Sequence, residues 1–131
     1  MTIPDTHKDL IEGPIVVALS TVMPDGRPQT TPVWCNYDGT HILVNTARGR
    51  QKDKNLTARP MATILVIDPQ NPYRYLEIRG QVAEVTEAGA VEHINQLGVL
   101  YTGKSFFKPG QKSPATRVIY KIKPVHVVAS G

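Results

Sequence analysis

The chain has 131 residues, of which 40% are hydrophobic and 20% charged, and its formal net charge is +4 at pH 7. This length fits a single domain over residues 1–131, and the composition is globular. No apolar run approaches the roughly 20 residues of a membrane span. The first residues hold acids and a proline where a secretory signal would be apolar, and Cys35 has no second cysteine to pair with. We therefore expect a cytoplasmic protein without membrane contact.

The basic balance of the chain, with a pI near 9.3, would suit a nucleic-acid-binding protein. However, Arg48, Arg50, Lys52 and Lys54 lie in one short segment, where Asp53 is the only acid. A nucleic-acid surface needs a longer track of positive charge. The clustering predicts a site for one anionic group, and no nucleic-acid partner is expected.

Alternating and β-branched runs predict six strands along the chain. In chain order they cover residues 14–21, 29–37, 41–46, 61–67, 73–85 and 117–122. Three helical segments are predicted between or before them, at residues 5–12, 49–58 and 87–101. Mostly antiparallel connections with short helices favour a mainly β fold, a β-barrel with helical additions.

Single residues refine this expectation. Pro32 has no amide hydrogen, so its strand should lie at an edge, start there or carry a bulge. Asp38 and Gly39 predict a tight hairpin turn. Gly80 predicts a bulge or a close backbone approach within the longest strand, and Thr86 is placed to cap the helix that follows.

The basic segment, residues 48–55, follows a strand and opens a helix. Free backbone amides and cationic side chains can meet an anion at such a point. Arg50 offers a planar pair of donors to phosphate oxygens, and Lys52 offers a mobile charge. These residues alone leave a solvated basic helix face as an equal alternative.

A second candidate surface runs from Gln29 through Thr31, Pro32 and Val33 to Trp34. A flat ring cofactor needs hydrogen-bond partners along one edge and apolar cover on its face. This segment can provide both. A tryptophan that only fills the end of a barrel is the alternative.

The remaining reactive residues form no catalytic set. Cys35 has no basic neighbour in sequence, so we expect an inert packed thiol. The histidines lack metal-ligand spacing, and no metal site is expected. Residues 98–105 match GxxxxGK[ST], but a phosphate-binding loop of that kind follows a strand and opens a helix, whereas this stretch follows a helix. An enzyme with this sequence would take its chemistry from a coenzyme, and no catalytic side chain is identified.

Four ordered segments, residues 25–34, 37–56, 68–80 and 117–124, resemble the pyridoxamine-phosphate-oxidase-like superfamily, in its F420-dependent flavin/deazaflavin oxidoreductase branch. The resemblance covers nearly the whole chain. It implies a six-stranded antiparallel Greek-key split β-barrel. It also implies a homodimer with two coenzyme sites at the subunit interface.

The resemblance also implies roles for individual residues. Arg50 and Lys52 would hold the coenzyme phosphate, with Asn55 supporting them, and the ring would lie against residues 31–34. The partner subunit would contribute from residues 73–79, which makes Tyr75 and Arg79 candidates. F420 carries a tail with carboxylates, and extra cations that would favour it are Arg48, Lys54 and Lys104.

The activity implied is hydride transfer between F420 and a small unsaturated or quinone-like acceptor. An FMN-dependent reductase or oxidase is the first alternative. A non-catalytic protein that stores or carries F420, FMN or a haem-like tetrapyrrole is the second, and haem would need His41 or His126 as axial ligand. Vitamin B6 oxidation is not expected, because the chain is short and shows no set of residues for pyridoxal phosphate.

Overall fold

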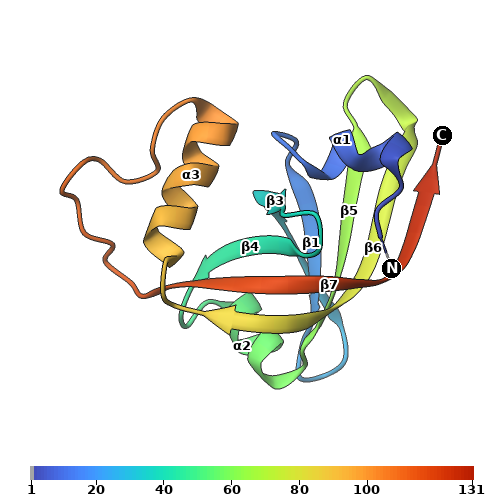
Figure 1. The fold of residues 1–131 in the computed structure, drawn as a ribbon. Helices are drawn as coiled ribbons and strands as arrows, with labels where there is room; N and C mark the ends of the chain where they lie inside the picture. The colour runs from blue at the N-terminus through green and yellow to red at the C-terminus, as the bar shows by residue number, and fades with distance from the viewer. Residues whose placement is uncertain (1) are drawn as a thin grey trace.

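The computed structural model describes residues 2–131 and arranges its strands in one antiparallel sheet that curls into a half-barrel (Figure 1). The strands are β1 (Val17–Val22), β2 (Pro28–Val33), β3 (Cys35–Tyr37), β4 (Ile42–Ala47), β5 (Met61–Asp68), β6 (Asn71–Thr86) and β7 (Arg117–Ser130). Their order across the sheet is β2-β1-β5-β6-β7-β4-β3.

Short helices flank the sheet. They are the 3-10 turn η1 (Asp5–His7) and the α-helices α1 (Lys8–Ile11), α2 (Gln51–Ala58) and α3 (Ala90–Thr102). Helix α2 packs against β1 and β4, and α3 stands beside β4 and β7, followed by the long loop that leads into β7 (Figure 1). In the described part of the chain, no helix is both long and apolar enough to cross a membrane.

The core fills the inner side of the curled sheet. Alternate residues of β5, such as Ile64 and Val66, are fully buried, as are Leu76 and Ile78 of β6. This follows from the period of two, which sends every second side chain of a strand to the same face. Burying each such side chain contributes about 1.5–3 kcal/mol, so the predicted alternation also sets which face becomes the core.

The sheet has seven strands instead of the six predicted, because residues 29–37 do not form one strand. The strand is interrupted at Trp34, and its two parts, β2 and β3, lie at opposite edges of the sheet. Pro32 lies in edge strand β2, as its missing amide hydrogen predicted. The residues on both sides of Trp34 have a strand-like pattern, so the sequence did not indicate the interruption. The curl of the sheet lets a single residue connect its two edges.

The prediction for Gly80 is confirmed, and the prediction for Thr86 is wrong. At Gly80 the register between β6 and β7 shifts, and an added Cβ would lie 2.6 Å from Ile122 Cγ2, so the bulge and close approach are confirmed. Thr86 does not cap α3. The N-cap is Gly89, at φ +78°, and the Thr86 hydroxyl donates to the carbonyl of Ala88 instead.

The hairpin predicted at Asp38 and Gly39 joins β3 to β4, with Tyr37 opposite Ile42. Its loop is wider than a two-residue turn. The Asp38 carboxylate accepts hydrogen bonds from the backbone amides of Thr40 and His41, at 2.8 and 2.6 Å. This side-chain contact, which aspartate commonly makes at turns, stabilises the longer loop.

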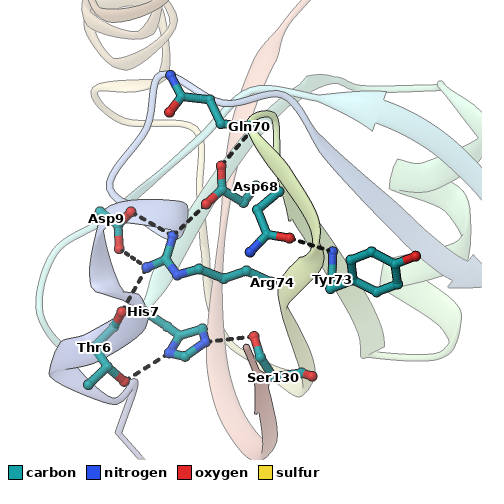
Figure 2. Close-up of polar contacts among 9 residues, drawn as sticks. Thr6, His7, Asp9, Asp68, Gln70, Tyr73, Arg74 and Ser130 are labelled. Carbon is teal, nitrogen blue, oxygen red and sulfur yellow. Dashed lines mark hydrogen bonds and ion pairs between the residues drawn. The ribbon is translucent and has the colours of Figure 1, made fainter.

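The N-terminal segment is held against the sheet by a cluster around Arg74 (Figure 2). The guanidinium of Arg74 donates to Asp9 at 2.6 Å, to Asp68 at 3.0 Å and to the carbonyl of Thr6 at 2.7 Å. Nearby, His7 donates from Nε2 to the carbonyl of Ser130 at 2.9 Å. These contacts join the segment before β1 to strands β6 and β7.

Candidate functional site

A cavity of about 220 Å³ lies where the chain crosses between the two edges of the sheet. It collects side chains from β2, β4, α2, α3, the loop after α3 and the start of β7. Its lining residues are Pro32, Val33, Trp34, Asn45, Thr46, Arg50, Lys52, Ile94, Phe106 and Arg117.

The charge of this cavity is wholly positive. Arg50 and Lys52 come from the start of α2, and Arg117 is the first residue of β7. Among the described residues, no carboxylate lines it. Burial lowers the pKa of Lys52, and the nearby charges of Arg50 and Arg117 lower it further. Burial and the charge of Arg50 likewise lower the pKa of Arg117. Like charges gathered without a counter-charge fit an anionic ligand.

Arg50 and Arg117 also differ from the other arginines in their bonding. Within residues 2–131, the terminal Nη nitrogens of these two side chains have no hydrogen-bond or ion-pair partner. The guanidinium groups of the remaining five are each bonded to a carboxylate, an amide or a carbonyl: Arg27, Arg48, Arg59, Arg74 and Arg79. The unpaired donors therefore belong to two residues that line the cavity.

A chain of neutral polar groups holds Arg117. Its Nε donates to Asn45 Oδ1 at 2.9 Å, and Asn45 Nδ2 donates to His93 Nδ1 at 3.0 Å. Because that Nδ1 accepts, the network assigns the ring proton to Nε2, which donates to Asn36 Oδ1 at 2.7 Å. Burial, with the charge of Arg117 as a second cause, lowers the pKa of His93 to about 4. The imidazole is therefore neutral at pH 7.

Aromatic side chains form the apolar wall. Trp34 stacks on Tyr101, with ring centroids 5.2 Å apart and planes 13° from parallel. Phe106 meets Trp34 edge-on at 6.1 Å, and the guanidinium of Arg117 lies 5.7 Å from the Phe106 centroid. A flat ring can pack against such a wall while its anionic end reaches the cations.

Strand β2 also carries a buried hydroxyl whose hydrogen bonding is unsatisfied among the described residues. The hydroxyl of Thr31 is buried and lacks a partner within residues 2–131. It is on the same face of β2 as Val33, which lines the cavity. Buried polar groups are normally satisfied, so an unpaired one on the strand segment that lines the cavity fits a bound ligand.

The structure brings together five of the residues selected from the sequence: Pro32, Val33, Trp34, Arg50 and Lys52. Two others lie outside the cavity. Asn55 is fully buried, donates to Thr21 Oγ1 at 3.0 Å and accepts from Gln51, so it holds α2 to β1 instead of a phosphate. Gln29 accepts from the same threonine at 3.3 Å.

The residues expected from a partner subunit lie on the outer face of the sheet. Tyr75 lines a shallow groove with Leu65 and Thr63, and Arg79 pairs with Glu77 at 3.1 Å. Neither reaches the cavity of its own chain. Their role across an interface stays a prediction.

The additional cations and histidines also lie apart from the cavity. Arg48 pairs with Asp53 and Glu87, both at 2.9 Å, so its charge is already neutralised, and Lys54 and Lys104 are exposed. His41 and His126, the two residues considered for haem, are not in the lining. The cavity residues that sequence reasoning missed are Asn45, Thr46, Ile94, Phe106 and Arg117.

The thiol of Cys35 is fully buried, and burial raises its pKa to about 12. The backbone amide of Cys35 donates to the Tyr101 hydroxyl at 3.1 Å. This is the packed, unreactive environment that was expected.

The half-barrel sheet and the cationic cavity where its edges meet define a split β-barrel protein. The family model for pyridoxamine 5'-phosphate oxidase matches residues 3–130, and the chain belongs to this oxidoreductase family.

Individual relatives are consistent with this. A pyridoxine/pyridoxamine 5'-phosphate oxidase of Rhodopseudomonas palustris (strain BisB5) is 32% identical over 90 residues, 68% of this chain. The match covers only 42% of that relative. A solved F420 reductase superposes with a TM-score of 0.87 at 34% identity, covering 96% of this chain and 98% of the other.

The same fold also occurs in the haem storage protein HutZ of Vibrio cholerae. It matches with a TM-score of 0.69 at 15% identity, over 100% of this chain and 96% of that one. At this identity the likeness concerns the fold alone. The fold is thus shared by proteins of different function, so the function has to be inferred from the residues of the site.

Proposed function

We propose that the chain is an F420-dependent oxidoreductase that transfers hydride between the deazaflavin and a small unsaturated or quinone-like acceptor. The observation that carries the proposal is the cavity in which Arg50 and Lys52 meet the aromatic wall at Trp34 without any carboxylate in the described lining. Similarity to an F420 reductase over nearly the full chain supports the choice of coenzyme.

The residues of this chain bind and orient in the proposed site. Arg50 and Lys52 hold the phosphate, and the backbone around Trp34 meets the ring. Ile94 and Phe106 exclude water from the side of α3. When bound, F420 supplies the hydride chemistry, and the protein contributes position and a dry environment.

A second cavity supports F420 over FMN. It has a volume of about 460 Å³ and shares Arg50, Phe106 and Arg117 with the first. FMN ends at its phosphate, whereas F420 continues into a tail with carboxylates. The adjoining space would receive that tail, beside the two arginines with unpaired terminal nitrogens.

The proposal includes a homodimer. Along β5 and β6 the outer face carries Leu65, the 47% exposed Ile67 and Tyr75 on one side of the sheet. A second copy packed on this face would bury these side chains and bring its own Tyr75 and Arg79 toward a cavity.

Ile67→Glu would place a charge in that interface. We expect the wild-type chain to scatter light as a dimer and this variant as a monomer, and a monomeric wild type would contradict the interface.

The experiment that tests the coenzyme is a titration of the purified protein with F420 and, separately, with FMN, followed by Trp34 fluorescence. Selective binding of F420 at micromolar concentration or tighter is expected. Preference for FMN would make the protein a flavin-dependent member, and binding of neither would contradict the proposal. Tight F420 binding without turnover over a broad acceptor panel would indicate a carrier.

A further inference from the structure

We infer that Arg117 is a third anion-binding residue of this cavity, and that His93, acting through Asn45, is its positioning residue. The ligand class is an organic anion with a phosphate group. The inference rests on the proposed function for the identity of the coenzyme, but its evidence is separate. It comes from the bonding of Arg117 itself, at a position that nothing in the basic segment predicts.

The first step concerns the charge of Arg117. The side chain is partly buried beside Arg50 and Lys52, and its one hydrogen bond goes through Nε to a neutral amide. Arg27, Arg48, Arg74 and Arg79 each pair with a carboxylate. Arg59 has no carboxylate partner among the described residues, but its Nε donates to the carbonyl of Val22 at 2.7 Å and its Nη2 to Asn55 Oδ1 at 3.4 Å, so a terminal nitrogen is bonded as well. A partly buried guanidinium without a counter-charge costs free energy unless an anion joins it. Arg117 is thus paired only when the cavity is filled.

The second step concerns its direction. Binding through Nε leaves both Nη nitrogens free, which are the two donors that a phosphate takes in a bidentate contact. Phe106 packs against the guanidinium at 5.7 Å and limits its movement on the side of the loop. Arg117 lines both cavities, so these donors reach a group that lies at their junction.

The third step concerns what fixes Asn45. Its Nδ2 donates to the carbonyl of Ala90 at 2.8 Å and to His93 Nδ1, which leaves Oδ1 for Arg117. If the amide turned over, its Nδ2 would face the donor of Arg117. His93 opposes this together with the Ala90 carbonyl, because its unprotonated Nδ1 and that carbonyl both accept from Nδ2. A neutral histidine therefore helps to fix the orientation of an arginine to which it is not hydrogen-bonded.

Arg117→Met tests the first part, because it removes the charge and keeps the length of the side chain. We expect affinity for F420 to fall about tenfold or more, as for loss of a hydrogen bond to a charged group. Affinity for FO, the deazaflavin fragment without phosphate and tail, should change less than about twofold on the same grounds. The control is Arg27→Met, which removes an 84% exposed arginine in the turn before β2. Equal losses for both ligands, or no loss, would overturn the assignment.

A matched pair of variants tests His93. His93→Asn places a carbonyl oxygen where Nδ1 accepts, whereas His93→Gln places its amide near Nε2 and leaves Asn45 without that acceptor. The Asn variant should keep F420 affinity close to the wild type, and the Gln variant should lose part of the affinity that Arg117→Met loses, because the Ala90 carbonyl still accepts from Asn45. In the Arg117→Met background the Gln substitution should add little. Additive losses, or losses for FO as well, would show a role in the fold only.

Failure of the proposed function can be told apart from failure of this inference. If the wild type binds neither F420 nor FMN, the coenzyme proposal fails, and inorganic phosphate then serves as the probe. A saturable shift of the Arg117 Nε–Hε signal in NMR, absent in Arg50→Ala, would still support a three-cation phosphate site. No shift of Arg117, with F420, FMN or phosphate, would overturn the inference.

Discussion

The two arginine-centred regions of this protein use the same side chain in opposite ways. Around Arg74, two carboxylates and a backbone carbonyl take the guanidinium donors and join the N-terminal segment to β6 (Figure 2). Around Arg117, a neutral amide takes one donor and two more cations lie nearby. The first arrangement is complete in the chain as it stands. In the proposed site the second becomes complete when an anion binds, which is how a binding site differs from a structural cluster.

The consequences for stability differ as well. Paired charges at Arg74 support the native state, and the neighbouring acids raise the pKa of its guanidinium. In the cavity, burial and, to a smaller extent, repulsion between like charges lower the pKa of Lys52 and Arg117, so the charged forms are less favourable than in water. A ligand with a phosphate should therefore stabilise the fold by mass action.

The largest expected effect is on affinity at the cavity. Replacing Arg50 and Lys52 together by alanine removes two charged contacts, and we expect F420 affinity to fall by on the order of a hundredfold. Because neither side chain has an ion-pair partner within residues 2–131, the fold should keep its thermal stability or gain slightly. Fluorescence titration and thermal melting of the same samples measure both. Unchanged affinity would remove these two residues from the site.

The next effect is on stability as a function of pH. The folded pKa of His93, about 4, lies below the value of 6.5 for an unperturbed histidine, so the unfolded chain binds more protons between these values. The stability that neutral His93 confers is complete above pH 6.5 and is lost as the pH falls toward 4. By linkage the loss approaches about 3 kcal/mol. Urea unfolding across this pH range should show the slope.

His93→Asn should remove this component of the slope and leave the part due to the aspartates. The charge that faces His93 is Arg117, which lowers its pKa. Arg117→Met should therefore reduce the slope without abolishing it, because burial is the larger cause. An identical slope in all three proteins would contradict a buried neutral imidazole.

A smaller effect is expected at Arg74, and it is the reverse of that at the cavity. Arg74→Met leaves Asp9 and Asp68 without their shared partner, so the melting temperature should fall. The affinity for F420 should stay within about twofold of wild type, since no charged contact to the ligand is lost. Arg27→Met is the control, because its ion pair with Asp25 is largely exposed. A large loss of F420 affinity in the Arg74 variant would contradict the distinction between the region around Arg74 and the region around Arg117.

The smallest effect is expected at Lys54, which is on the same helix as Lys52 but is exposed. Lys54→Ala should change F420 affinity by less than about twofold at physiological salt, because exposed charges are screened. Comparison with Lys52→Ala at equal ionic strength checks whether position in the cavity, more than net charge, decides affinity. Equal losses in the two variants would favour a diffuse attraction to a basic surface.

The sequence by itself determined much of the local structure. A continuous apolar run predicted β5, and alternating apolar residues predicted β6. Pro32 indicated an edge strand and Gly80 a bulge. Each of these rules depends on a residue and its near neighbours. Arg50 and Lys52 were found for the same reason. They are two residues apart at the start of one helix, so their proximity is evident from the sequence.

Only the tertiary structure decided the composition of the site. The break at Trp34 depends on the curl of the whole sheet, which brings β2 and β3 close at opposite edges. Arg117 and Asn45 are 72 residues apart and meet through the pairing of β4 with β7. The family resemblance implied that Asn55 supports the phosphate site, yet its side chain is buried and donates to Thr21 of β1. Which donors remain unpaired is a property of all contacts together, and no local pattern of residues records it.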